Sequence, residues 1–224
     1  MNFKGINIEN NNEREFIDNV LEEVCDLTKN KTHISELYTA DNVIKFKSSK
    51  LNLNEDILNT LNKITKFYNS LESTRLHYLN NAKIERELDY IDKQGIHCVF
   101  ISILTKFLLK KKYKLNLNLV QGYYKFENNI IASMIFGEYS LGFHAWCELN
   151  GAIIDLTFNT QQSSSYNGFL EGNNIIGIYN NDIDFIGYIE SDIVVNKYLE
   201  DFLKINNLSL DEWLDMYIEY LCLI

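Results

Sequence analysis

The chain has 224 residues, of which 46% are hydrophobic, and its formal net charge is −10. This length and apolar content indicate one packed domain and exclude a disordered chain. The acidic balance excludes nucleic acid and disfavours anionic membranes as partners, because both attract excess Lys and Arg. The sequence has no apolar run long enough to span a membrane and no secretory signal, so we expect a cytoplasmic protein.

Residues 1–90 are expected to form a mainly helical N-terminal region of the same domain. Apolar residues recur at helical spacing from Glu13 to Thr28 and again from Asn54 to Leu79. A polar stretch with weak strand signals separates these two helical patterns. None of these patterns indicates chemistry, so the functional residues are expected in the rest of the chain, residues 91–224.

The pattern changes after Gly95. From Cys98 to Leu109 almost every residue is apolar, which predicts a helix buried in the middle of the domain. The cluster Lys110 to Lys112 falls where this helix should end. Cations at that position interact favourably with the negative end of the helix dipole, so we interpret the cluster as a feature of the helix end.

Three strand-like runs follow, at Leu115–Phe126, Gly142–Leu149 and Ala152–Phe158. The last two are separated by Asn150-Gly151, a strong signal for a tight hairpin. A polar loop is expected at 159–168, and a helical region from Tyr198 to Leu221, with Ser209 at the start of its second half. The order along the chain is helices, then a buried helix, then an antiparallel sheet. This order predicts an α+β fold.

Cys98 is the cysteine best placed for chemistry among those at positions 25, 98, 147 and 222. It lies just inside the start of the buried helix, where unsatisfied N–H groups and the helix dipole stabilise a thiolate. Cys25 and Cys222 are better interpreted as small apolar residues. The alternative for Cys98 is a buried structural thiol.

The hairpin supplies the partners that a reactive cysteine needs. A two-residue turn would pair Leu149 with Ala152 and place His144 and Asp155 on one face as diagonal neighbours. Asp155 could then orient the imidazole of His144, and His144 could take the thiol proton from Cys98. Trp146 and Thr157 are expected on the same face, because side chains alternate between the two faces of a strand.

Two further assignments concern the surroundings of this trio. Gln94 could donate a hydrogen bond to an oxyanion beside the backbone N–H of Cys98, or it could be an exposed loop residue. Trp146 could form a wall of the substrate-binding site, or it could fill the core. No metal site and no cofactor are expected, because His144 and Cys147 face opposite sides of their strand and cannot bind one ion.

Together these motifs resemble the bacterial transglutaminase-like superfamily over roughly residues 94–158. The resemblance rests on G-x-x-C opening an apolar helix, on LVQGYY, and on HAWCELNGAIIDLTF. It implies a papain-like core, in which a central helix packs on an antiparallel sheet, and acyl transfer through a thioester. It also implies that Cys98, His144 and Asp155 form a catalytic triad. Many members have Gly-x-Cys, whereas this chain has Gly95-Ile-His-Cys98.

The resulting prediction is a cysteine enzyme that acts on the amide carbonyl of a peptide or protein substrate. Hydrolysis is expected rather than crosslinking, because crosslinking requires a site that excludes water. The alternatives are a non-catalytic binding module that retains the fold and an acyltransferase that uses a thioester. The sequence carries no signal for an oligomeric state.

Overall fold

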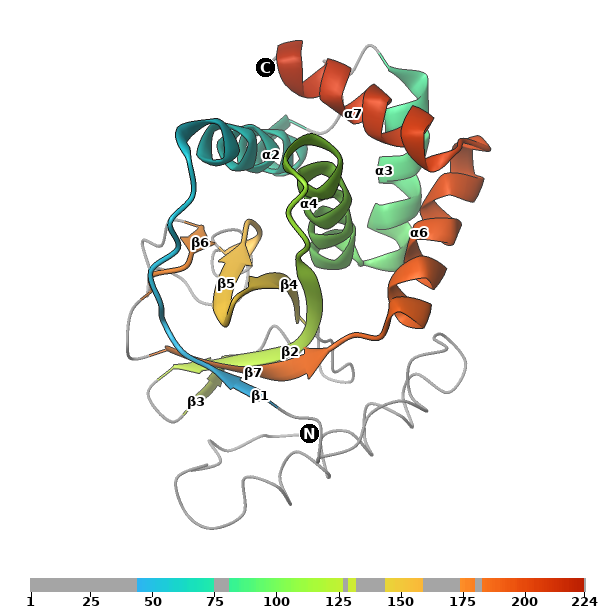
Figure 1. Cartoon of the computed structure of the whole chain (residues 1–224). Helices are drawn as coiled ribbons and strands as arrows, with labels where there is room; N and C mark the ends of the chain where they lie inside the picture. The colour runs from blue at the N-terminus through green and yellow to red at the C-terminus, as the bar shows by residue number, and fades with distance from the viewer. Residues whose placement is uncertain are drawn as a thin grey trace.

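The structure, a computed structural model, describes residues 44–74, 81–126, 129–131, 144–158, 174–179 and 183–223. This part of the chain combines helices with an antiparallel sheet, so the predicted α+β class is confirmed (Figure 1). The helix expected at Glu13–Thr28, the loop expected at 159–168 and Cys25 lie outside the described residues.

Helix α4 (His97–Tyr113) is the buried helix that the sequence predicts. Its side chains from Cys98 to Leu109 are buried, apart from that of Lys106. It contacts the four other described helices, which are α2 (Glu55–Thr74), α3 (Ala82–Gln94), α6 (Asp192–Asn206) and α7 (Leu210–Leu223) (Figure 1). None of the helices in the described ranges is both long and apolar enough to cross a membrane.

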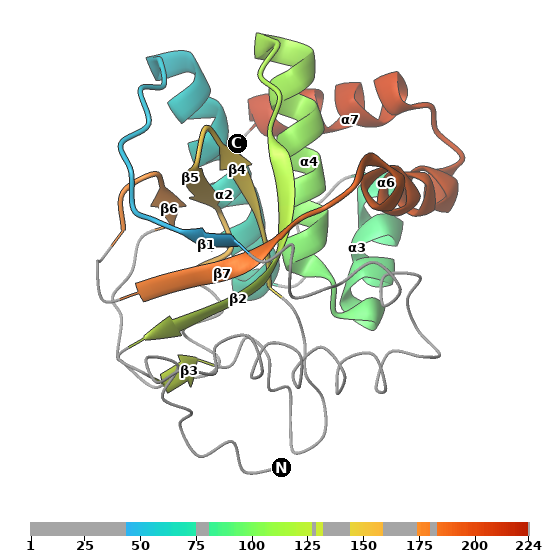
Figure 2. The ribbon, with the colours of Figure 1, turned by 60° about the horizontal axis from the view of Figure 1, so that its bottom comes forward.

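The described strands form one sheet in the order β1-β7-β2-β4-β5-β6, with β3 paired to β2 (Figure 2). Their bounds are β1 Ile44–Phe46, β2 Asn118–Phe126, β3 Asn129–Ile131, β4 His144–Leu149, β5 Ala152–Asp155, β6 Ile175–Ile176 and β7 Ile183–Ile189. All of the neighbouring strands pair antiparallel. Strand β7 lies between β1 and β2, and the sequence patterns did not predict it.

The predicted register of the β4–β5 hairpin is confirmed. Leu149 pairs with Ala152 and Cys147 pairs with Ile154. Asn150 and Gly151 both have positive φ, 53° and 84°, as the two central residues of a type I′ turn require. Because strand side chains alternate, this register decides which residues of the hairpin share a face.

The two faces of the hairpin contribute to different apolar clusters. Ala145 and Cys147 face the large cluster that surrounds α4. Trp146 and Ile153 belong to a second cluster on the opposite face, where Trp146 contacts Phe185 edge-on at 5.2 Å between ring centroids. The sheet is therefore buried on both sides at the hairpin.

Helix α2 and the last helix, α7, share the core around α4. Helix α2 packs on α4 and on α7, and β1 pairs with β7.

Helix α6 begins at Asp192, six residues before the predicted start at Tyr198, because Ser191 caps it by accepting a hydrogen bond from the N–H of Val194. The extra turns bring Tyr198 into the middle of the helix.

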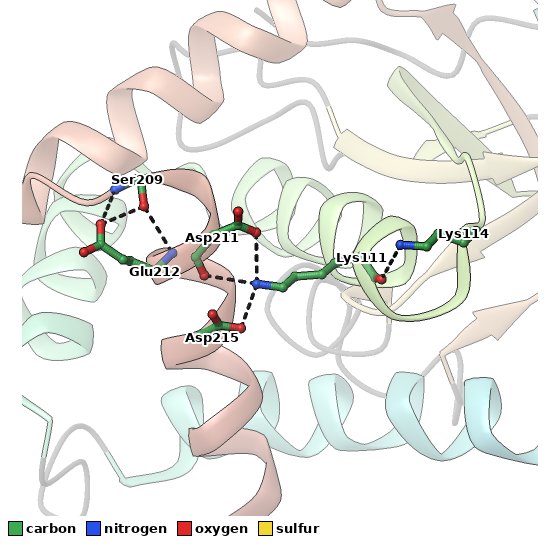
Figure 3. Close-up of polar contacts among 6 residues, drawn as sticks. All are labelled: Lys111, Lys114, Ser209, Asp211, Glu212 and Asp215. Atoms are coloured by element: carbon green, nitrogen blue, oxygen red, sulfur yellow. Dashed lines mark hydrogen bonds and ion pairs between the residues drawn. The ribbon is translucent and has the colours of Figure 1, made fainter.

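The start of α7 and the end of α4 agree with the sequence predictions (Figure 3). Ser209 and Glu212 form a reciprocal capping box, in which the Ser209 N–H donates to the Glu212 carboxylate at 2.8 Å. Lys111, in the last turn of α4, lies 2.7 Å from the carboxylate of Asp215 and 3.0 Å from that of Asp211. One member of the basic cluster, Lys111, therefore joins the end of α4 to α7.

A buried carboxylate connects α3 with α7. Glu87 is fully buried and accepts hydrogen bonds from Trp213 Nε1 at 2.7 Å and from the Tyr217 hydroxyl at 2.6 Å. Burial raises the pKa of Glu87 to about 7, although both hydrogen bonds act to lower it. The folded protein therefore binds a proton more tightly at this group than the unfolded chain does.

We expect Glu87→Gln to flatten the pH dependence of stability in acidic solution. Between about pH 4.5 and pH 7 the unfolded chain loses the Glu87 proton first, so the free energy of unfolding of the unaltered protein should fall as pH rises. The neutral amide has no such dependence and can still hydrogen bond to Trp213 and Tyr217. Urea unfolding at about pH 5 and pH 8 measures the difference. If the free energy of unfolding changes equally with pH in the two proteins, Glu87 does not titrate in this way.

Candidate functional site

A tight connection between α3 and α4 positions Cys98. Gly95 ends α3 with φ 65°, and its N–H donates to the carbonyl of Asp92, while the N–H of Ile96 donates to the carbonyl of Ile91. This is a Schellman ending, which favours glycine because of the positive φ. Gly95 is therefore a helix-ending residue, and the chain turns directly from it into α4.

Cys98 lies in the first turn of α4, as predicted. The residue before this helix, Ile96, provides no side-chain cap, and the first hydrogen bond of the helix runs from the N–H of Phe100 to the carbonyl of Ile96. Helix geometry therefore leaves the N–H groups of the first turn without intrahelical partners, and they favour negative charge nearby. The Cys98 side chain is 7% exposed, and it lies close enough to His144 to help raise the pKa of that imidazole.

Asp155 holds the imidazole of His144 on its other side. Its Oδ2 atom lies 2.5 Å from Nε2 of His144, and the two side chains are 1% and 0% exposed. The Oδ1 atom of Asp155 accepts hydrogen bonds from the backbone N–H and the hydroxyl of Thr157, both at 3.0 Å. Asp155 is thus fixed from two directions, and His144 lies between it and Cys98.

The charges of its neighbours determine the protonation state of His144. Burial alone would lower its pKa, but the Asp155 carboxylate and then Cys98 overcome this effect and raise the pKa of His144 to about 10. The imidazole therefore stays protonated at neutral pH. A protonated imidazole beside a thiol favours a thiolate–imidazolium pair, which is the reactive form of a cysteine nucleophile.

The two other described cysteines differ from Cys98. Cys147 faces away from His144, and its thiol donates to the carbonyl of Ser102 at 3.2 Å. Burial raises the pKa of Cys147 to about 12, so this thiol stays protonated and unreactive. Cys222 is exposed near the end of α7, which corrects the prediction that it fills an apolar space.

The structure also places Gln94, Trp146 and His97. Gln94 is the exposed last residue of α3, and its role as an oxyanion donor stays a prediction. Trp146 lies beside His144, at 5.7 Å between ring centroids, but it is fully buried among aromatic side chains, so its surroundings are those of a core residue. His97 pairs at 2.5 Å with Asp92 on α3, away from the His144–Asp155 pair.

Two polar residues that the sequence patterns did not single out join β2 to α6, and one of them, Tyr198, is within electrostatic reach of Cys98. Gln121, on β2, is 3% exposed and donates to the hydroxyl of Tyr198, on α6, at 3.1 Å. A polar residue between Val120 and Gly122 was the available signal for Gln121. No such signal marked Tyr198, because an aromatic residue on a helix usually contributes to packing.

A cavity of about 340 Å³ lies elsewhere, among α2, α7 and the last turns of α4. Its lining includes Lys63 and Lys112, whose ammonium groups already donate to the carbonyl of Leu221 and to the hydroxyl of Thr60. It includes none of the three predicted triad residues. Within the described ranges, no three side chains of His, Cys, Asp or Glu converge as metal ligands.

Comparisons of the chain with protein-family models, with curated proteins and with solved structures find no match. Only the residues of the site and their geometry therefore bear on the function of the protein.

Proposed function

We propose that this protein is a cysteine-nucleophile enzyme of the transglutaminase-like type, with a papain-like core. Cys98 is the nucleophile, His144 the general acid–base, and Asp155 the residue that orients His144. The observation that carries the proposal is the buried connection from Cys98 through His144 to Asp155. Packing alone gives no reason to place a cysteine at an uncapped helix start beside a charged histidine–carboxylate pair. A catalytic role explains why these groups are together.

The proposed reaction acts on an amide or peptide carbonyl. The Cys98 thiolate attacks the carbonyl carbon, and the electron pair of the C=O bond moves onto oxygen. The tetrahedral species then expels the amine, which takes its proton from the His144 imidazolium, and a thioester remains on Cys98. Water, deprotonated by neutral His144, attacks the thioester carbon, and the C–S bond breaks to release the acid and the Cys98 thiolate beside the reprotonated imidazole. Asp155 holds the ring and stabilises its charge throughout.

Hydrolysis is our first choice over transfer to an amine or crosslinking. Transfer requires a site that keeps water from the thioester, and no described residue provides a reason to assign such a site. The rival functions are a binding module without turnover, and an acyltransferase that takes its acyl group from a thioester. The three functions differ in whether Cys98 acquires an acyl group and in what removes it.

An activated ester tests the proposal without knowledge of the natural substrate. We expect p-nitrophenyl acetate to release p-nitrophenolate with an initial burst and to leave an acetyl group on Cys98, identified by peptide mass spectrometry. Decay of the acetyl-enzyme in water alone indicates a hydrolase, and decay only with added amine indicates a transferase. Absence of acetylation at Cys98 would contradict the enzyme proposal and favour the binding module.

A further inference from the structure

A hydrogen bond between Gln121 and Tyr198 joins β2 to α6 near the start of α4. Gln121 precedes Gly122, the residue of β2 that pairs with His144. Helix α6 packs on the first turns of α4 through Phe202 and Phe100, whose rings meet edge-on at 5.3 Å between centroids. Tyr198 lies one turn before Phe202 on the same side of α6, and it packs against the apolar cluster that contains Cys98.

The direction of the hydrogen bond between these residues determines what the Tyr198 hydroxyl can do. The amide Nε2 of Gln121 can only donate, so the Tyr198 oxygen is the acceptor at 3.1 Å. The hydroxyl proton is therefore directed elsewhere. Burial and, among nearby charges, Glu190 and Cys98 raise the pKa of Tyr198 well above its usual range, despite the opposing hydrogen bond from Gln121. Tyr198 is thus a neutral donor within electrostatic reach of the thiol.

We infer that the Tyr198 hydroxyl donates a hydrogen bond to the oxyanion that forms when Cys98 attacks a carbonyl, and that Gln121 is the positioning residue that aims it. This inference rests on the proposed function. The backbone N–H groups in the first turn of α4 are the other donors near the same carbon. Tyr198 therefore takes the role that the sequence suggested for Gln94, which is exposed at the end of α3.

The step that Tyr198 assists is the addition of the thiolate. With p-nitrophenyl acetate, the C–S bond forms while the electron pair of the C=O bond moves onto oxygen, where Tyr198 stabilises the negative charge. Re-formation of the C=O bond then expels p-nitrophenolate with its electron pair. Alkylation by iodoacetamide forms a C–S bond and expels iodide without any oxyanion. The two reagents therefore separate an effect on the oxyanion from an effect on the thiolate.

The test compares both reactions of Cys98 in the unaltered protein and in Tyr198→Phe. We expect acetylation by p-nitrophenyl acetate to slow about 10²-fold, as for loss of one oxyanion donor, and alkylation by iodoacetamide to change less than about twofold. Gln121→Met should cause part of the same loss. Gln121→Met combined with Tyr198→Phe should be no slower than Tyr198→Phe alone, since Gln121 acts through the hydroxyl.

Tyr113→Phe is the matched control, because it also removes a hydroxyl that joins two elements. Tyr113 hydrogen bonds to Thr60 at 2.7 Å, at the far end of α4, and its loss should leave both rates unchanged. Thermal unfolding of each variant checks that it folds. The inference would be overturned if Tyr198→Phe were acetylated at the unaltered rate, or if acetylation and alkylation slowed by the same factor. Either outcome would leave the proposed function intact. If Cys98 of the unaltered protein reacts with neither reagent, the proposed function fails, and the inference with it.

Discussion

Cys98→Ser should abolish acetyl-enzyme formation and turnover while the protein remains folded. The change replaces one sulfur atom with oxygen at a side chain that is 7% exposed, so we expect the melting temperature to change by a few degrees at most. A serine hydroxyl is far less acidic than a thiol, and His144 alone does not ionise it. Loss of the nucleophile in another triad enzyme costs roughly 10⁶ in rate. Ester turnover and peptide mass spectrometry measure the loss.

Cys147→Ser is the matched control for this prediction. Cys147 is also buried, it lies on β4 three residues after His144, and its thiol donates to the carbonyl of Ser102. The serine hydroxyl can make the same hydrogen bond, so acetylation of Cys98 should continue at the unaltered rate. If Cys98→Ser unfolds the protein whereas Cys147→Ser loses the activity, the nucleophile has been assigned to the wrong thiol.

Asp155→Asn should lower the acetylation rate by about 10⁴, the loss found for the equivalent change in serine proteases. The asparagine oxygen can still accept the two hydrogen bonds from Thr157, which turns its NH₂ group towards Nε2 of His144. Nε2 must then accept, so the neutral ring carries its proton on Nδ1 and cannot take one from the thiol. Removal of the carboxylate also removes the main cause of the raised pKa of His144.

Asp92→Asn provides a control with the same chemistry outside the site. Asp92 pairs with His97 at the same 2.5 Å, but both side chains are 35% exposed. This change should alter the acetylation rate by less than about twofold. An equal loss in both variants would indicate that the effect arises from net charge or folding, and Asp155 would not be the orienting residue.

The hairpin and the buried helix could be predicted from sequence because their signals are local. Asn150-Gly151 specifies a type I′ turn, and the alternation of side chains then places His144 and Asp155 on one face. The continuous apolar run after Cys98 could only be a helix in the middle of the core. These two elements carry the three predicted triad residues, so the trio could be proposed without a structure.

The remaining part of the site depends on contacts between distant segments. Strand β7 contains Asp184 and Gly187, which weaken its strand signal, and it owes its central place to pairing with β1 and β2. Helix α6 begins where Ser191 caps it, and this start decides that Tyr198 reaches Gln121. No local pattern encodes a hydrogen bond between residues 77 positions apart, so the sequence pointed to Gln94, a polar side chain shortly before Cys98.

The pH dependence of alkylation at Cys98 tests most directly whether His144 activates this thiol. The protein should carry Cys25→Ser and Cys222→Ser, since Cys222 is exposed and would react with iodoacetamide. Rates are measured from about pH 5 to pH 9, with His144→Ala and Asp155→Asn beside the unaltered site, and thermal unfolding confirms that each variant is folded.

We expect Cys98 beside an intact His144 to keep most of its alkylation rate from about pH 8 down to about pH 6, because the imidazolium retains the thiolate. In His144→Ala the rate should fall about tenfold per pH unit below about pH 8.5, as for an ordinary thiol. If the alkylation rate of the unaltered site falls in the same way below about pH 8.5, and His144→Ala does not change it, then Cys98 is a structural thiol. That result would contradict the proposal that the protein is a cysteine-nucleophile enzyme.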